Sequence, residues 1–182
     1  MIIEKILKPI WKEFIYGGHL QSLGTVAIIL VPVILLNIKI TWDILFISFL
    51  LFYTIYLYNR WKELNIDHLT NPQRTEHLET YIKKAPIILL LVILLLIGSL
   101  FYFSNFRFTV FALLVLFFGL LYTVFFKKLT KKIFAFKNFY VAIFFTLVVI
   151  FPVIYYNYPL TEVLIRGLLA FMIFVFLKTI MM

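Results

Sequence analysis

The sequence predicts an all-α protein, a polytopic bundle of helices that cross a membrane. Hydrophobic residues make up 64% of the 182 residues and charged residues only 14%, proportions outside the range of water-soluble domains. The apolar residues form long runs, and about 20 such residues suffice to span the hydrocarbon core. A backbone in lipid must satisfy its own hydrogen bonds, and runs of this length do so as helices rather than barrel strands. We therefore expect a single membrane domain over residues 1–182.

The first expected element is a helix over residues 2–13 that lies in the membrane interface. Its apolar side chains would share one face while its lysines lie elsewhere, the pattern of an interfacial helix. The apolar members are Ile3, Ile6, Leu7, Ile10 and Phe14, and the basic ones are Lys5, Lys8 and Lys12. Pro9 is expected to bend or restart this helix, because proline lacks an N–H and clashes with the preceding turn.

Six membrane spans follow in order. They are expected at Phe14–Asn37, Trp42–Tyr58, Ala85–Phe103, Phe108–Phe126, Ile133–Tyr155 and Leu160–Lys178. The second is short, and a helix that continues into the polar run from Asn59 would complete it. A short amphipathic helix within Thr75–Lys84 is expected before the third span.

The positive charge indicates how these helices are oriented. The chain has 17 lysine and arginine residues against 8 acidic ones, a net charge of +9. Most of the basic residues lie before the first span, after the second and fourth spans, or at the chain end. Because cytoplasmic loops are enriched in lysine and arginine, we expect the N-terminus and the Asn59–Lys84 loop to face the cytoplasm. The charge is interpreted as topology and attraction to anionic lipid, without a nucleic-acid partner.

Three polar residues at the end of the second span carry the main functional signal. Asn59, Glu63 and Asp67 are four residues apart, so on a helix they share one face. The chain has no cysteine, which excludes thiolate metal sites and leaves oxygen ligands. An amide and two carboxylates at a membrane mouth are suited to hold Mg²⁺ against a phosphate. The alternative is an ordinary solvated helix end.

These residues resemble the first signature of the UbiA superfamily of intramembrane prenyltransferases. Asn59, Asp67, Asn71, Pro72 and Arg74 match it, with Glu63 at the fourth position after Asn59. Residues 121–128 and 136–142 resemble the end of the fourth and the start of the fifth helix of that family. The six expected spans correspond to the first six of its nine helices. The second aspartate-rich motif of the family is missing, so we expect the chain to be incomplete at its C-terminus and to show little turnover alone.

The resemblance implies a Mg²⁺-dependent transfer of an isoprenoid chain from a prenyl diphosphate to a small or lipid-like acceptor. Asn59, Glu63 and Asp67 would be the catalytic residues and metal ligands. The diphosphate or prenyl chain would contact four further residues: Arg74, Tyr122, Lys127 and Lys128. The polar start of the first span would line the acceptor pocket through His19, Gln21 and Ser22.

Each assignment has a structural alternative. The lysines also serve as positive flanks, Tyr122 also suits an interfacial aromatic belt, and the polar start of the first span also suits close helix packing. For the whole chain, the alternative is a non-catalytic protein of the same fold that binds prenyl lipid or depends on a partner. The acceptor and the prenyl chain length cannot be inferred from the sequence.

Overall fold

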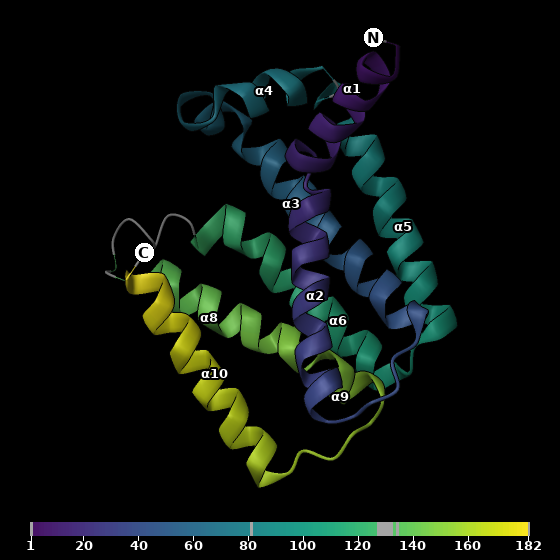
Figure 1. Ribbon diagram of the computed structural model, residues 1–182, viewed down its shortest axis with the longest axis vertical. Coiled ribbons are helices and arrows are strands. Elements are labelled where there is room, and N and C mark those ends of the chain that lie inside the picture. Colours follow the sequence, from purple (N-terminus) through teal and green to yellow (C-terminus); the bar gives the residue numbers. More distant parts are fainter. Residues whose placement is uncertain (1, 81, 127–132, 134, 182) are drawn as a thin grey trace.

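The computed structural model describes residues 2–80, 82–126, 133 and 135–181, without the side chains of residues 2–6, 63, 65–70 and 82. This part of the chain is helical and contains no strand (Figure 1). The elements are α1 (Ile2–Tyr16), α2 (His19–Leu35), α3 (Trp42–Thr70), α4 (Pro72–Glu79), η1 (Ile82–Lys84), α5 (Ala85–Phe103), α6 (Phe106–Leu121), η2 (Tyr122–Phe126), α8 (Phe136–Val149), α9 (Phe151–Tyr155) and α10 (Glu162–Met181). The all-helical prediction is confirmed.

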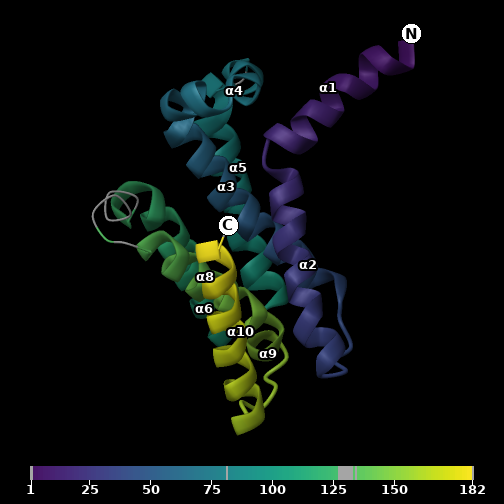
Figure 2. The same cartoon turned by 60° about the vertical axis from the view of Figure 1, so that its left-hand side comes forward.

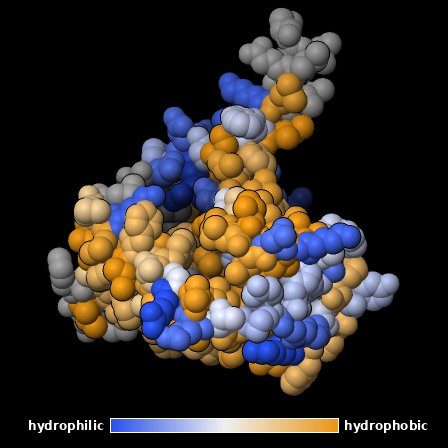
Figure 3. Space-filling view, turned by 60° about the horizontal axis from the view of Figure 1, so that its bottom comes forward, coloured by the Kyte–Doolittle hydropathy of each residue, from blue (hydrophilic) through white to orange (hydrophobic). Residues whose placement is uncertain are grey.

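Within the described residues, five helical stretches are long and apolar enough to cross a membrane. They are Trp42–Lys62, Ala85–Phe103, Phe106–Phe126, Phe136–Tyr155 and Glu162–Met181. A sixth candidate is α2, which passes the same test together with part of α1, from which it is bent by 58°. The fold is therefore that of a multi-pass integral membrane protein. In Figure 3 broad hydrophobic areas are interrupted by hydrophilic patches on the surface in view.

The start of the first span differs from the prediction. Residues 14–16 belong to α1, which continues through Pro9, and α2 begins only at His19. The bend lies between the two helices because Gly18 adopts φ 101°, in the left-handed region that glycine enters at little cost. A Cβ atom on Gly17 would lie 2.6 Å from the backbone oxygen of Glu13, which cannot move aside as a side chain can, so the neighbouring position also favours glycine.

Helix α3 forms the centre of the bundle. Its side chains Ile44, Ile47, Leu51 and Phe52 are fully buried. Helices α2, α5 and α6 pack directly against it, and Phe52 meets α8 and α9 through the rings of Phe144 and Phe151. Helix α10 packs on α8 at the edge of the bundle (Figures 1 and 2). None of its residues is buried. Trp42–Lys62, the part of α3 that can span the membrane, is the least apolar of the five spans and lies at the centre of the bundle.

Helix α3 also continues beyond the membrane-spanning length, as the sequence predicts. It runs without a break to Thr70, and Asn71 then begins α4 by accepting a hydrogen bond from the backbone N–H of Arg74 at 3.4 Å. Pro72 occupies the first turn of α4, where a missing N–H costs nothing. The predicted Thr75–Lys84 helix is divided: α4 ends at Glu79, and Ile82–Lys84 form a separate 3₁₀ turn.

Tyrosine hydroxyls tie the opposite end of the bundle together. The hydroxyl of Tyr155 on α9 donates to Oδ2 of Asp43 in the first turn of α3 at 2.6 Å, and it lies 2.9 Å from the carbonyl oxygen of Phe103. The hydroxyl of Tyr156 accepts the backbone N–H of Thr41 at 2.8 Å. These contacts connect three segments that are more than 50 residues apart in the chain.

Candidate functional site

A cavity of about 220 Å³ lies between α3, the α6–η2 segment and α8. Its lining is mostly apolar and aromatic, and it includes the amide of Asn59 and the ammonium group of Lys137. The full lining comprises Phe52, Ile55, Tyr56, Asn59, Gly119, Tyr122, Lys137, Tyr140, Val141, Phe144 and Phe145. Two of the residues selected from the sequence, Asn59 and Tyr122, therefore meet at one cavity although they are far apart in the chain.

Asn59 is held in place by the segment that follows α6. Here the helix widens into a π-helix over Tyr122–Phe126, an irregularity often found at functional sites. The hydroxyl of Thr123 in this turn donates a hydrogen bond to Oδ1 of Asn59. An oxygen of this kind has a second lone pair, so it can accept from Thr123 and still bind a cation or a further donor.

Stacked aromatic rings form one wall of the cavity. The ring of Tyr122 stacks on that of Tyr140 with centroids 4.6 Å apart, and Tyr140 lies 6.1 Å from Phe144. Tyr140 is anchored by a 2.7 Å hydrogen bond from its hydroxyl to the carbonyl oxygen of Phe118. Such rings pack well against an apolar chain, and their π faces attract positive charge.

Gly119 and Lys137 complete the cavity in different ways. Gly119 lets α6 approach α3 closely, since a Cβ atom there would lie 2.5 Å from Cδ1 of Ile55. Lys137 lies in the first turn of α8 with an exposed side chain. Its ammonium group can therefore meet an anionic ligand at the rim without a large desolvation cost.

The predicted metal face continues along α3 from this cavity. Because α3 is helical to Thr70, positions 59, 63 and 67 lie on one face of it. The side chains of Glu63 and Asp67 lie outside the described part of the chain. An amide and two carboxylates are a donor set that fits a hard cation. Among the described residues, no three histidine, aspartate or glutamate side chains are grouped around a possible metal position.

The remaining predicted diphosphate contacts are only partly placed. Arg74 lies half-buried on α4, and the neighbouring Asn71 and Pro72 act as the start of that helix. Lys127 and Lys128 lie outside the described residues. The match of Asn71 and Pro72 to the family signature therefore also has a local structural cause.

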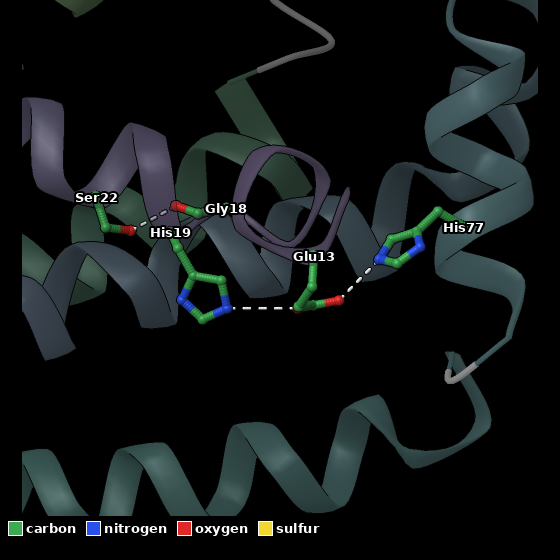
Figure 4. Close-up of polar contacts among 5 residues, drawn as sticks. All are labelled: Glu13, Gly18, His19, Ser22 and His77. Carbon is green, nitrogen blue, oxygen red and sulfur yellow. Dashed lines mark hydrogen bonds and ion pairs between the residues drawn. The ribbon is translucent and has the colours of Figure 1, made fainter. Parts of the chain in front are cut away.

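None of the predicted acceptor residues, His19, Gln21 and Ser22, lines the cavity that contains Asn59. His19 lines a second cavity, with Pro9, Ile10, Glu13, Phe14 and His77, between α1, α2 and α4. The hydroxyl of Ser22 donates to the carbonyl oxygen of Gly18 at 2.8 Å, which favours its structural interpretation (Figure 4). Gln21 is half-buried on α2.

Several residues of these two regions were not selected from the sequence. Thr123 and Tyr140 lie within the segments 121–128 and 136–142 that resemble the family, but the resemblance gave neither of them a role. Glu13 and His77 carried no signal, because a contact between residues 64 positions apart leaves no local pattern.

The helical bundle and its apolar spans define the class of protein as an integral, multi-pass membrane protein. Comparison of the chain with protein-family models, with curated proteins and with solved structures finds no match.

Proposed function

We propose that the protein binds a prenyl diphosphate and transfers its isoprenoid chain to a small or lipid-like acceptor, as UbiA-type prenyltransferases do. The observation that carries the proposal is the shared cavity of Asn59 and Tyr122. The sequence predicts Asn59 as a ligand of the Mg²⁺ that would bind the diphosphate, and Tyr122 as a contact of the diphosphate or the prenyl chain. An aromatic cavity that opens beside a polar helix face is suited to an amphipathic ligand of that kind.

Different residues of the cavity would bind the two parts of the substrate. The isoprenoid chain would pack among Phe52, Tyr140 and Phe144, while the diphosphate would lie near Asn59 and the ammonium group of Lys137. Positions 63 and 67, one and two turns further along α3, would add carboxylates on the same face. When bound there, Mg²⁺ would supply positive charge that favours departure of the diphosphate.

The transfer itself requires a carbon–oxygen bond to break and a new bond to form. The electron pair of the broken bond leaves with the diphosphate, and the allylic carbon becomes positive. The π faces of Tyr122 and Tyr140 can stabilise that charge, each by about 1–2 kcal/mol when desolvated. The acceptor then forms the new bond with its own electron pair and releases a proton. Apolar surroundings keep water from competing for the allylic carbon.

Substitution of Asn59 tests this proposal. We expect Asn59→Ala to weaken Mg²⁺-dependent binding of labelled prenyl diphosphates about tenfold or more, because a liganding oxygen and its contact with Thr123 are lost. Asn59→Asp retains an oxygen and should bind more tightly than the alanine variant. Binding would be measured on the whole chain in lipid nanodiscs, with donors of several chain lengths, in Mg²⁺ and in EDTA.

The aromatic wall has its own matched pair of variants. Tyr122→Ala should weaken binding, whereas Tyr102→Ala removes a tyrosine that is 82% exposed on α5 and should not. Transfer of the labelled prenyl group to compounds extracted from membranes would establish that the protein is a prenyltransferase. Saturable binding without transfer would favour a non-catalytic prenyl-lipid-binding or partner-dependent protein. Absence of saturable binding by every donor would contradict the proposal.

A further inference from the structure

Helix α1 presents chemically different sides along its described length. Leu7, Ile10 and Trp11 are exposed by 56%, 59% and 63%, and they recur at the spacing of one helix face. Lys8 and Lys12 are exposed beside them. A helix with an apolar face flanked by lysines is typical of one that lies in the headgroup region of an anionic bilayer.

The position of α1 relative to the membrane follows from α2. Because α2 begins only two residues after α1 ends and runs into the apolar bundle, the Gly17–Gly18 junction lies near one membrane surface. Figure 2 shows α1 leaning away from α2 and from the rest of the bundle. The 58° bend therefore decides whether the apolar face of α1 lies along the lipid or points into water.

A cluster of three titratable residues holds this bend, and we refer to Glu13, His19 and His77 as the Glu13 clasp. Oε2 of Glu13 on α1 lies 2.8 Å from Nε2 of His77 on α4, and Oε1 lies 3.4 Å from Nε2 of His19 on α2. Figure 4 shows the two imidazole rings on opposite sides of the carboxylate. One side chain of α1 is thus connected to two other helices.

Neighbouring residues make further contacts around the Glu13 clasp. Oε1 of Glu13 occupies the space that a side chain at position 17 would need. The ring of His19 stacks on that of Tyr53 in α3 with centroids 4.5 Å apart. Tyr16 adds a second link from α1 to α4, since its hydroxyl donates to Oε1 of Gln73 at 3.1 Å.

The charge on Glu13 is consistent with this role. The hydrogen bond with His19 lowers the pKa of the Glu13 carboxyl, partial burial opposes this, and the hydrogen bond with His77 lowers it further. The carboxylate is therefore the form that the two imidazoles stabilise. Because the rings approach from opposite sides, the arrangement is that of a bridged pair of hydrogen bonds, and the three side chains do not surround a metal position.

We propose that the Glu13 clasp fixes α1 at the angle that lays its Leu7–Ile10–Trp11 face on the headgroup layer of an anionic bilayer. Loss of the carboxylate charge or of an imidazole partner releases α1 about the glycine junction. This role is independent of prenyl-diphosphate binding.

Distance measurements between α1 and α4 test the clasp. Because the chain has no cysteine, spin labels can be attached to Glu4→Cys and Glu79→Cys in the otherwise unchanged chain in nanodiscs. We expect a narrow distance distribution that broadens and shifts in Glu13→Gln and, to a lesser extent, in His77→Gln. Glu76→Gln, the same change at an exposed residue next to His77, is the control and should leave it unchanged. An unchanged distribution in both clasp variants would overturn the proposal.

Quenching of Trp11 tests the lipid surface. Bromine atoms placed near the lipid headgroups quench the fluorescence of nearby tryptophans. The chain has three tryptophans, so the contribution of Trp11 is the quenching that is lost in the Trp11→Phe variant. We expect this contribution to be larger in phosphatidylglycerol than in phosphatidylcholine bilayers and to fall in Glu13→Gln. A Trp11 that is not quenched in either lipid would show that α1 does not contact the bilayer, and would overturn that part of the proposal.

Discussion

At the scale of single residues, Gly119 determines how closely α6 can approach the centre of the bundle. Its neighbour across the interface is Ile55 of α3, which is only 5% exposed. Small residues let membrane helices pack closely and gain van der Waals contact, which must replace the hydrophobic effect as a driving force in lipid. Gly119 also lines the proposed prenyl cavity, so packing and cavity shape depend on the same missing side chain.

We predict that Gly119→Ala destabilises the protein by about 1–3 kcal/mol, because an added methyl group overpacks a closed interface. Ile55→Val removes the Cδ1 atom that the new methyl would meet at 2.5 Å, so the double variant should recover part of the loss. Gly98→Ala is the control, since a Cβ atom there meets nothing within 4 Å. Thermal unfolding in detergent gives the comparison, and equal melting temperatures for Gly119→Ala and Gly98→Ala would contradict the prediction.

At the scale of helices, α9 behaves as a five-residue connector that locks the far end of α3. It is separated from α8 at Ile150, just before Pro152, and it carries Tyr155 to Asp43. A hydrogen bond to a charged group is stronger than one between neutral groups, and less water competes for it where the site is partly buried.

Removal of the Tyr155 hydroxyl should therefore lower stability. We expect Tyr155→Phe to cost about 1–2 kcal/mol of unfolding free energy, because the Asp43 carboxylate loses a close donor. Tyr102→Phe removes a hydroxyl from an exposed tyrosine and serves as the control. Denaturant unfolding in mixed micelles measures the difference, and a Tyr155→Phe protein as stable as Tyr102→Phe would contradict it.

The helices themselves were largely predictable from sequence, whereas their junctions were not. Length and apolarity suffice to locate a span such as Ala85–Phe103, whose bounds agree with α5. The break at Gly17–Gly18 escaped the prediction because glycine is common inside membrane helices and does not by itself mark the end of one. The π-helix at Tyr122–Phe126 has no sequence period that separates it from an α-helix.

The candidate site was predictable only where its residues share a helix face or a family motif. Asn59 and Tyr122 were selected in this way, and only the structure shows that both line one cavity. The clasp residue Glu13 could not be found, because its partner His77 follows 64 positions later. Gln21 and Ser22 were predicted to line an acceptor pocket or to serve helix packing, because both roles place polar residues at the same positions of a helix. Only the structure shows that the Ser22 hydroxyl bonds to the carbonyl oxygen of Gly18.

At the scale of the whole molecule, the helices alternate in direction and leave two chemically different ends. The N-terminal helix and α4 lie at one end, and the loop between α2 and α3 lies at the other (Figure 1). Lysines and arginines are concentrated in the sequence segments of the first end. We propose on this basis that α1 and α4 face the cytoplasm.

Single cysteines in the cysteine-free chain test the orientation. A membrane-impermeant maleimide added to intact cells should label Lys39→Cys, in the loop between α2 and α3, and should leave Glu79→Cys on α4 unlabelled. After the cells are opened, both should react, which controls for accessibility. Labelling of Glu79→Cys alone in intact cells would reverse the assigned orientation.

The π-helix beside Asn59 has a consequence for how chain length can vary. A π-turn contains one residue more than the α-turn it replaces, so Tyr122–Phe126 holds a one-residue insertion that costs no change in the span before it. Deleting Tyr122 would move Thr123 by one helical position and rotate it away from Asn59 by about 100°. The contact between Thr123 and Asn59 therefore depends on the number of residues in this turn as well as on their chemistry.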